Sequence, residues 1–460
     1  MGRKRGHYQP SKASGIKRGR QQGEGKRGTW DKELEDSRDV KFVLRSPLFE
    51  AYYQAQGIMP PQEWSAFVTT LREPLPATFR IQQDCSYIEK LREELAEHSA
   101  HIVTIDGRDI KPVAPLPWYP GGVAYQVGCD RRAIRKSPEL AAFHRWMVDH
   151  TESGAITRQE AVSMVPPLFL DVRPGHVVLD TCAAPGSKTA QIMEALSAGG
   201  DASGLVVANE VDRDRAYMLV HQCRRVITPC LCVTWCAAQH FPQLGRQPSR
   251  AEVRAAKVAA AAAAAEGAVA VAARTEKGDA GIADKVGLAA TAAAAAAAAA
   301  GSGVFDRVLA DVPCTGDGTL RKQPGIWRSW GAGGAIGLHP MQLAIALRGA
   351  ALLRVGGLLV YSTCSFNPIE NEAVVAALLA SGGGSLELVD SAAEVSGLQR
   401  RPGLRTWKVL DDRAWNRAQA TAAAKKRTEA SAAQRAAGRG PGGRYGGGGC
   451  GGGRERGRDG

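Results

Sequence analysis

Two cysteines follow short apolar runs that end at turn-forming residues. Cys314 lies in DRVLADVPCTGDG (306–318), and Cys364 lies in GLLVYSTCSFNPIENE (357–372). Such runs are typical of interior strands of a parallel sheet, and ligands of α/β proteins bind beyond the carboxyl ends of those strands. If the two strands are neighbours, about 5 Å apart, both thiols face one site beside Asp311. Because a thiolate is a strong nucleophile, this pattern suggests covalent chemistry. Two unrelated buried cysteines are the alternative that the spacing leaves open.

A loop upstream of these cysteines suggests a ligand site. The sequence CAAPGSK follows an apolar run and precedes a helical pattern, and its small residues would let the backbone approach a ligand. Glu210 ends the next predicted strand, where doubly wound folds use an acid to hold ribose hydroxyls. Each feature alone could be structural, but together they favour a nucleoside cofactor. The residues expected to bind it are Cys182, Ala183, Ala184, Pro185, Gly186, Ser187, Lys188, Glu210 and Asp311.

Alternating strand and helix patterns would position these residues. From His176 onward the pattern predicts a parallel, doubly wound α/β sheet. Its strands are expected at 176–180, 204–210, 230–235, 305–311 and 357–363, with a candidate sixth at 385–390, and its helices at 189–196, 212–225, 340–353 and 369–380. Residues 30–150 predict a small α+β domain, in which REPLPATFRI contains a strand. The larger domain is expected at 151–415.

Three segments have compositions that argue against a packed core. Residues 1–29 are basic and polar, and residues 416–460 are rich in Gly and Arg, so both are expected to be disordered tails. More than half of residues 251–300 are alanine, which favours helix but offers no large apolar face to bury. We therefore expect residues 245–303 to be a surface insertion of fluctuating helix with no function of its own.

The net charge of +13 is unevenly distributed. Residues 1–30 carry nine Lys/Arg and one Glu, and residues 413–460 carry eleven Lys/Arg and three acids, which leaves the rest of the chain slightly negative. Basic tails attract polyanions and add salt-dependent affinity for nucleic acid. Tails that only keep the chain soluble are the alternative.

The ten cysteines do not form a secreted disulfide framework, and the sequence shows no signal peptide. The nine-alanine run at 292–300 is too short to cross a bilayer. We expect a protein of a reducing intracellular compartment, in the nucleus rather than the cytoplasm, with no membrane association and no obligate protein partner.

The assembled motifs resemble those of Sun-family RNA (cytosine-5) methyltransferases. The resemblance rests on CAAPGSK, ANEVD, DVPCTGDGTLRK and STCSFNPIENEAVV, and in the amino-terminal region on REPLPATFRI, LPWYPGG, RKSPELAAFH and TESGAITRQEAVSMVPPL. It covers about residues 30–415 apart from the insertion, and it is strongest to the eukaryotic tRNA (cytosine-5) methyltransferases. The resemblance implies a Rossmann-like methyltransferase fold preceded by an RNA-contacting domain, with S-adenosylmethionine as cofactor and RNA, in particular tRNA, as substrate.

The same resemblance implies roles for four residues. It makes Cys364 the nucleophile that adds to carbon 6 of cytosine, and Cys314 the thiol that assists product release. Asp311 would hold the ring nitrogen and the exocyclic amine, and Lys188 would help to orient the base. The target base must leave its stack to reach such a pocket.

The sequence departs from the family pattern at two places. Cys236 stands after the third strand, where family members usually have an Asp near the adenine ring. No hydrophobic run after Trp415 could form the family's last strand, so the strand before Cys364 is expected at an open edge. A non-catalytic RNA-binding relative is therefore the rival hypothesis. A DNA methyltransferase is disfavoured, because that class lacks the TCS cysteine.

Two further groups remain open as candidates. One comprises His221, Cys223, Cys230, Cys232, Cys236 and His240, which crowd one stretch without the paired hooks of a structural zinc site, so we expect no metal. The other comprises Trp327 and Trp330, which could stack on a base or pack in the core.

Overall fold

The computed structural model describes residues 43–410 except 84, 100–102, 106, 111–112, 201–202, 227, 245–302 and 392. The predictions of disordered tails and of a helical insertion lie outside the described residues, apart from the few positions at their edges. Among the described residues, no helix has the length and apolar character that crossing a membrane requires.

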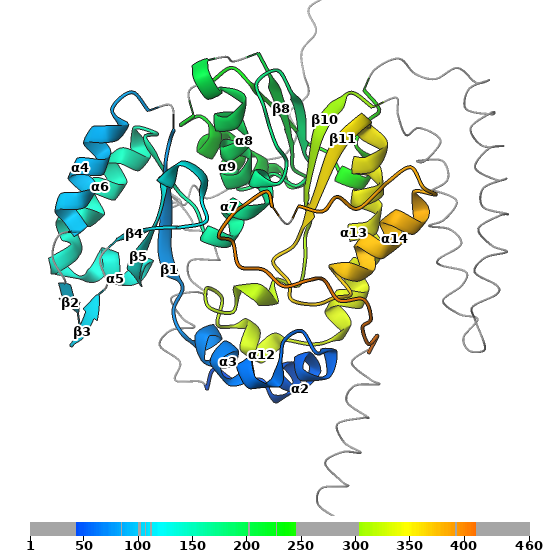
Figure 1. The fold of residues 1–460 in the computed structure, drawn as a ribbon, viewed down its shortest axis with the longest axis horizontal. Coiled ribbons are helices and arrows are strands. Elements are labelled where there is room, and N and C mark those ends of the chain that lie inside the picture. The colour runs from blue at the N-terminus through cyan, green and yellow to red at the C-terminus, as the bar shows by residue number, and fades with distance from the viewer. Residues whose placement is uncertain are drawn as a thin grey trace, which may run out of the picture.

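A five-stranded parallel sheet forms the larger body (Figure 1). Its strands, in the spatial order β11-β10-β7-β8-β9, are β7 (Val177–Asp180), β8 (Leu205–Asn209), β9 (Leu231–Thr234), β10 (Phe305–Asp311) and β11 (Leu353–Ser362). All four neighbouring pairs are parallel. This arrangement confirms the predicted doubly wound sheet. The strand order reverses between β7 and β10, the place where such sheets bind ligands.

Helices cover both faces of this sheet, because successive strand residues point to opposite sides. Val178 and Leu309 pack with α8 and α9, whereas Leu179 and Val308 pack on the other face, in a cluster that includes the end of α13. The helices of this body are α7 (Ala161–Leu168), α8 (Ser187–Leu196), α9 (Arg213–Cys223), α12 (Ile326–Ser329), α13 (Gly333–Leu352) and α14 (Glu372–Ser381). The sheet is thus buried on two sides, as its apolar runs predict.

The sixth strand predicted at 385–390 is wrong, since these residues have no regular structure. Leu386 packs beside α14 instead, and Leu388 and Val389 are exposed. Within the described part of the chain β11 pairs with β10 alone, so it is an edge strand and most of its residues are partly exposed. Among the described residues this agrees with the open edge expected for the strand before Cys364, and it differs from the interior position that the apolar run alone suggests. A short apolar run does not by itself distinguish an interior strand from an edge strand.

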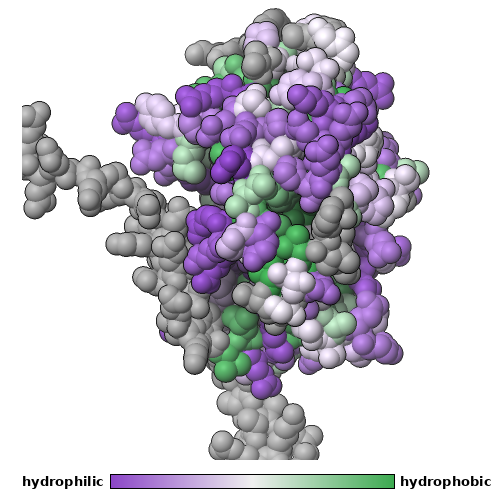
Figure 2. Space-filling view, turned by 90° about the vertical axis from the view of Figure 1, so that its left-hand side faces the viewer, coloured by the Kyte–Doolittle hydropathy of each residue, from purple (hydrophilic) through white to green (hydrophobic). Residues whose placement is uncertain are grey.

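The smaller body contains an antiparallel sheet of order β4-β5-β1-β6. Its strands are β1 (Pro76–Ile81), β4 (Ala114–Pro115), β5 (Ala124–Asp130) and β6 (Ile156–Arg158), beside a hairpin of β2 (Val103–Ile105) and β3 (Arg108–Ile110) and helices α4 (Ile88–Ser99), α5 (Arg131–Lys136) and α6 (Ala141–Glu152). The strand predicted in REPLPATFRI is confirmed as β1. The sheet includes β6, beyond residue 150, where the sequence placed the domain boundary. Figure 2 shows that hydrophilic residues cover much of the left-hand face of Figure 1, with hydrophobic residues gathered in its middle.

Two helices that precede β1 pack elsewhere. They are α2 (Pro47–Gln56) and α3 (Trp64–Arg72), and they share a core with Leu320 and Trp327 of the larger body. Figure 1 shows them beside α12, below the parallel sheet. Single-turn 3-10 helices complete the described elements: η1 (Pro61–Glu63), η2 (Pro120–Gly122), η3 (Pro138–Leu140), η4 (Ala198–Gly200), η5 (Ala238–His240) and η6 (Asp317–Thr319).

Candidate active site

The loop after β10 contains Cys314, and the loop after β11 contains Cys364; we call them the first and the second cysteine loop. They meet at the carboxyl ends of the two strands. Asp311 pairs with Ser362 in the sheet, so the loops that follow leave from adjacent positions. Cys314 Sγ lies 3.1 Å from Cys364 Sγ, and the backbone N–H of Cys364 donates to Cys314 Sγ at 3.3 Å. This contact confirms that the strands are neighbours and that the thiols share one site, which excludes two unrelated cysteines.

The two thiols differ in how readily they ionise. The hydrogen bond with Cys314 lowers the pKa of Cys364, and so does the charge of Lys188, against the opposing effects of burial and of the charge of Asp311. The same hydrogen bond, together with burial, raises the pKa of Cys314. Cys364 is therefore the more acidic thiol of the pair. Since Cys364 is exposed, the more acidic thiol is also the more accessible one.

This difference predicts the pH dependence of alkylation. A lowered pKa keeps a thiolate populated further down the pH scale, so iodoacetamide should modify Cys364 at a lower pH than an ordinary thiol. Cys314→Ala removes the donor and should raise the pH midpoint of this reaction, whereas Cys314→Ser keeps a donor and should retain part of the shift. Peptide mass spectrometry over a pH series measures both variants. A midpoint that Cys314→Ala leaves unchanged would contradict the assignment.

Asp311 lies beside the thiols and is held on both oxygens. Lys188 Nζ is 2.7 Å from Asp311 Oδ2, and the Ser362 hydroxyl donates to Asp311 Oδ1 at 2.8 Å. Lys188 comes from the first turn of α8, so the loop CAAPGSK and the cysteine loops converge on one point. The structure thus brings together Lys188, Asp311, Cys314 and Cys364, the residues that the sequence singled out for chemistry.

The loop between β7 and α8 is tied closely to its neighbours. Ala183 N–H donates to the carbonyl of Asn209 at 2.8 Å. Gly186 adopts a φ of +111°, and a Cβ at this position would lie 3.0 Å from Leu219 Cδ1 and 3.2 Å from Cys223 Sγ. Only glycine fits both this backbone conformation and this close approach. The loop is therefore fixed in place between β7, β8 and α9.

Two buried carboxylate oxygens beside this loop have no hydrogen-bond partner among the described residues. They are Asp180 Oδ1, at the end of β7, and Glu210 Oε2, just after β8. Arg215 Nη2 approaches the latter oxygen at 3.5 Å, and Glu210 Oε1 accepts a hydrogen bond from the N–H of Asp212 at 3.0 Å. An acid with an open oxygen after the second strand suits the hydroxyls of a ribose. These residues therefore fit a nucleoside cofactor.

Three residues near the site were not identified from the sequence. Burial raises the pKa of Asp180 to about 7, and its Oδ2 accepts a hydrogen bond from Thr189 at 2.7 Å. Glu370 is fully buried and accepts hydrogen bonds from Thr315, in the first cysteine loop, and from Ser365, in the second. Asp317 is also fully buried. The only sequence signal for these acids is their place at strand ends or in the turns after the cysteines.

Cys236, at the departure from the family pattern, contacts Asn209. Its N–H and its Sγ both lie 3.2 Å from Asn209 Oδ1, and burial raises the pKa of its thiol. The thiol at position 236 is thus neutral and is hydrogen-bonded to Asn209, at the end of β8.

The remaining candidates have structural surroundings. Trp327 is only 2% exposed, and Trp330 donates to Asp317 Oδ2 at 3.0 Å, so both belong to the core that includes α2 and the stacking alternative is wrong for Trp327. Of the candidate metal ligands, Cys223 and Cys230 are buried. In the part of the chain that the structure describes, no three His, Cys, Asp or Glu residues are grouped to hold a metal ion.

Comparisons with a family model and with individual proteins agree on one family of RNA methyltransferases. The family described as 16S rRNA methyltransferase RsmB/F matches residues 167–247 and 255–402. The multisite-specific tRNA:(cytosine-C(5))-methyltransferase of Schizosaccharomyces pombe is 42% identical over 418 residues, which cover 86% of this chain and 54% of that protein. The tRNA (cytosine(34)-C(5))-methyltransferase of Drosophila melanogaster is 40% identical, with 82% of this chain and 46% of that protein covered.

A third relative shows the same relationship. The multisite-specific tRNA:(cytosine-C(5))-methyltransferase of Saccharomyces cerevisiae is 38% identical over 388 residues, which cover 82% of this chain and 50% of that protein. The chain therefore spans about half the length of the curated relatives that it matches.

Proposed function

The chain belongs to the Sun family of RNA methyltransferases, described as RsmB/F, and on this premise we propose that it methylates carbon 5 of cytosine in tRNA. The observation that carries the proposal is the contact between the Cys314 and Cys364 thiols beside Asp311 and Lys188. The choice of tRNA is supported by the names of the three relatives, which are 38% to 42% identical to this chain.

The residues of the site suit the activation of a cytosine ring. Carbon 5 of cytosine is a poor nucleophile until a thiolate adds to carbon 6. In the proposed reaction Cys364 Sγ forms this bond, because it is the exposed thiol with the lowered pKa. Asp311, beside Lys188, accepts a hydrogen bond from the exocyclic amine on one oxygen and, once it carries a proton, donates to ring nitrogen 3 from the other, which stabilises the negative charge that builds up on the ring.

The Cys314 thiol has a proposed role in the release of the product. When bound, S-adenosylmethionine supplies an electrophilic methyl group, and Glu210 with the loop Cys182–Lys188 would hold this cofactor. Carbon 5 takes this methyl group, and its proton then passes through a base to solvent. The electron pair of the broken C–H bond restores the ring double bond and expels the Cys364 thiolate. We propose that Cys314, 3.1 Å from Cys364 Sγ, assists this release.

The test of the proposal is transfer of labelled methyl from S-adenosylmethionine to bulk tRNA, followed by base analysis. We expect the label in 5-methylcytosine. Label in another base, or tRNA binding without any transfer, would contradict the proposed activity.

A basic surface of the smaller body supports an RNA substrate. Helix α5 carries Arg131, Arg132, Arg135 and Lys136 without an acid, and none of these four has an ion pair among the described residues. Burial and the charges of Arg131 and Arg225 lower the pKa of Arg158, on β6, and no carboxylate in the described part of the chain offsets them. Unneutralised cations of this kind suit the phosphates of a nucleic acid backbone.

This surface gives a prediction for RNA binding. Arg131→Ala combined with Arg158→Ala should weaken tRNA binding and flatten its salt dependence, by about 0.7 to 0.9 in the log–log slope for each phosphate that the variant no longer neutralises. The matched control, Lys90→Ala with Arg92→Ala, removes two α4 cations that ion-pair with glutamates, and should change the slope little. Filter binding over a salt series measures both. Equal slopes for the two double variants would show that other cations, such as those of the termini, hold the RNA.

A further inference from the structure

A buried carboxylate that the reaction above does not use lies under the second cysteine loop. Asp317 is fully buried and accepts three hydrogen bonds. The donors are the hydroxyl of Tyr53, the indole N–H of Trp330 at 3.0 Å and the backbone N–H of Phe366 at 2.8 Å. Phe366 is two residues after Cys364, so Asp317 connects helix α2 to the backbone that carries the exposed thiol.

A backbone contact strengthens the same connection. Gly318 N–H donates to the carbonyl of Cys364 at 2.9 Å, and a Cβ on Gly318 would lie 2.6 Å from that oxygen. The turn at Asp317 and Gly318 therefore holds the second cysteine loop at both Cys364 and Phe366. The position of Cys364 Sγ relative to Cys314 depends on this turn, because Cys314 precedes it by only a few residues.

Helix α2 is held rigidly where it supplies Tyr53. The Phe49 ring meets the Trp327 ring edge to face at 5.3 Å, and the Tyr53 and Trp330 ring centres are 5.7 Å apart. These aromatic contacts fix the helix against the core next to the turn. The helix lies outside residues 167–402, over which the family match extends, so the family match does not account for this contact.

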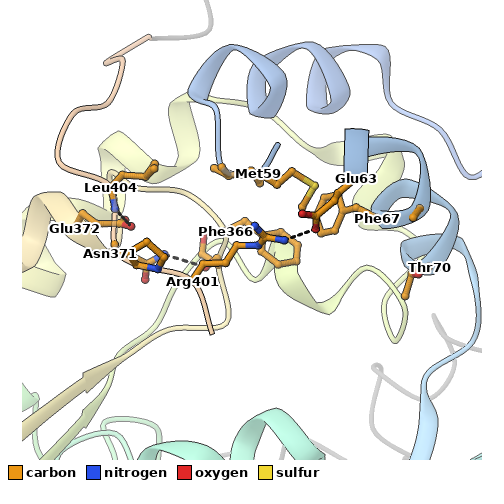
Figure 3. Close-up of a pocket in the computed structure, with 14 residues that line it drawn as sticks. Met59, Glu63, Phe67, Thr70, Phe366, Asn371, Glu372, Arg401 and Leu404 are labelled. Atoms are coloured by element: carbon orange, nitrogen blue, oxygen red, sulfur yellow. Dashed lines mark hydrogen bonds and ion pairs between the residues drawn. The ribbon is translucent and has the colours of Figure 1, made fainter. Parts of the chain in front are cut away.

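The space beside the loop allows it to move if this connection is broken. A pocket of about 640 Å³ lies between α3, the second cysteine loop and residues 401–404. Figure 3 shows Phe67 and Phe366 together on its wall, with the ion pair of Arg401 and Glu63 alongside. A Phe366 released from Asp317 therefore has room to shift, and the backbone of Cys364 would move with it.

We propose that Tyr53 and Asp317 are positioning residues for the Cys364 thiol, with helix α2 as their support. This inference rests on the proposed function for its link to methyl transfer. Burial raises the pKa of Asp317, and the hydrogen bond from Tyr53 opposes that rise. Loss of the Tyr53 hydroxyl therefore favours the protonated carboxyl, which is a weaker acceptor for the N–H of Phe366. The loop that holds Cys364 is released as a result.

Two neighbouring tyrosines provide a matched experiment. Tyr53→Phe removes the hydroxyl and keeps the ring, whereas Tyr52→Phe removes a hydroxyl that donates to neutral Asn367 at 3.2 Å. We expect Tyr53→Phe to slow iodoacetamide modification of Cys364 by about tenfold. Its pH midpoint should rise, because loss of the Cys314 hydrogen bond, the largest effect on the pKa of Cys364, outweighs the opposing loss of the Asp317 charge. Tyr52→Phe should change the rate less than about twofold. Asp317→Asn, which keeps the shape and removes the charge, should act as Tyr53→Phe does.

Alkylation keeps this test separate from the proposed function, because it requires neither RNA nor cofactor. An unchanged alkylation rate and midpoint in Tyr53→Phe would overturn the inference, as would equal effects of Tyr53→Phe and Tyr52→Phe. If the intact chain transfers methyl groups, Tyr53→Phe should also lower kcat by about tenfold and leave tRNA affinity unchanged. An effect on affinity alone would assign Tyr53 to RNA binding instead.

Discussion

Cys364→Ala is expected to abolish methyl transfer and to leave no covalent RNA–protein adduct, because no thiolate remains to reach carbon 6 of the base. Cys314→Ala is expected to have the opposite effect on the amount of adduct. The attack by Cys364 survives in this variant, whereas release is impaired, so the adduct should accumulate. Denaturing gel electrophoresis with labelled tRNA and S-adenosylmethionine distinguishes the two outcomes.

The contrast between the two variants identifies the nucleophile. Both side chains are small and their thiols are 3.1 Å apart, so each variant serves as the steric control for the other. An adduct that persists in Cys364→Ala and disappears in Cys314→Ala would reverse the two roles.

Glu370→Ala is expected to destabilise the fold and the site together. The fully buried carboxylate of Glu370 accepts hydrogen bonds from Thr315 N–H at 2.9 Å, the Thr315 and Ser365 hydroxyls at 2.5 Å each, and Gln342 Nε2 at 3.0 Å. Removing it leaves several buried donors without a partner, each at a cost of about 1 to 3 kcal/mol. We expect the free energy of unfolding to fall by about 3 kcal/mol, as measured by urea denaturation.

A neighbouring acid supplies the control for this prediction. Glu372 is partly exposed and accepts a hydrogen bond from Leu404 N–H at 3.0 Å. Glu372→Ala should lower the free energy of unfolding by about 1 kcal/mol or less. Similar losses in Glu370→Ala and Glu372→Ala would show that Glu370 does not hold the two cysteine loops together.

Much of the site could be predicted from the sequence because parallel strands end at one edge of a sheet. The runs before Asp311 and Cys364 are local patterns, and the rules of α/β topology bring their ends together. The loop Cys182–Lys188 is predictable for the same reason, since a strand and a helix flank it. These inferences require only short stretches of sequence.

The features that were missed depend on contacts between distant residues. Tyr53 and Asp317 are 264 residues apart, and no periodic pattern connects them. The prediction of a strand at 385–390 was wrong for a related reason. Its alternating apolar residues fit a strand, but Leu386 packs beside α14, and a strand needs a hydrogen-bonding partner that periodicity does not specify.

The connection from β9 to β10 has its two ends anchored by contacts of their own. After β9, the carbonyl of Phe241 accepts a hydrogen bond from Arg348 Nε of α13 at 2.6 Å, and before β10 a Cβ at Gly303 would lie 2.1 Å from the carbonyl oxygen of Leu352. The entropy lost on closing a chain segment grows only with the logarithm of its length, so doubling the segment costs about 0.6 kcal/mol. The folding equilibrium should therefore depend more on these two anchored ends than on the number of residues that join them.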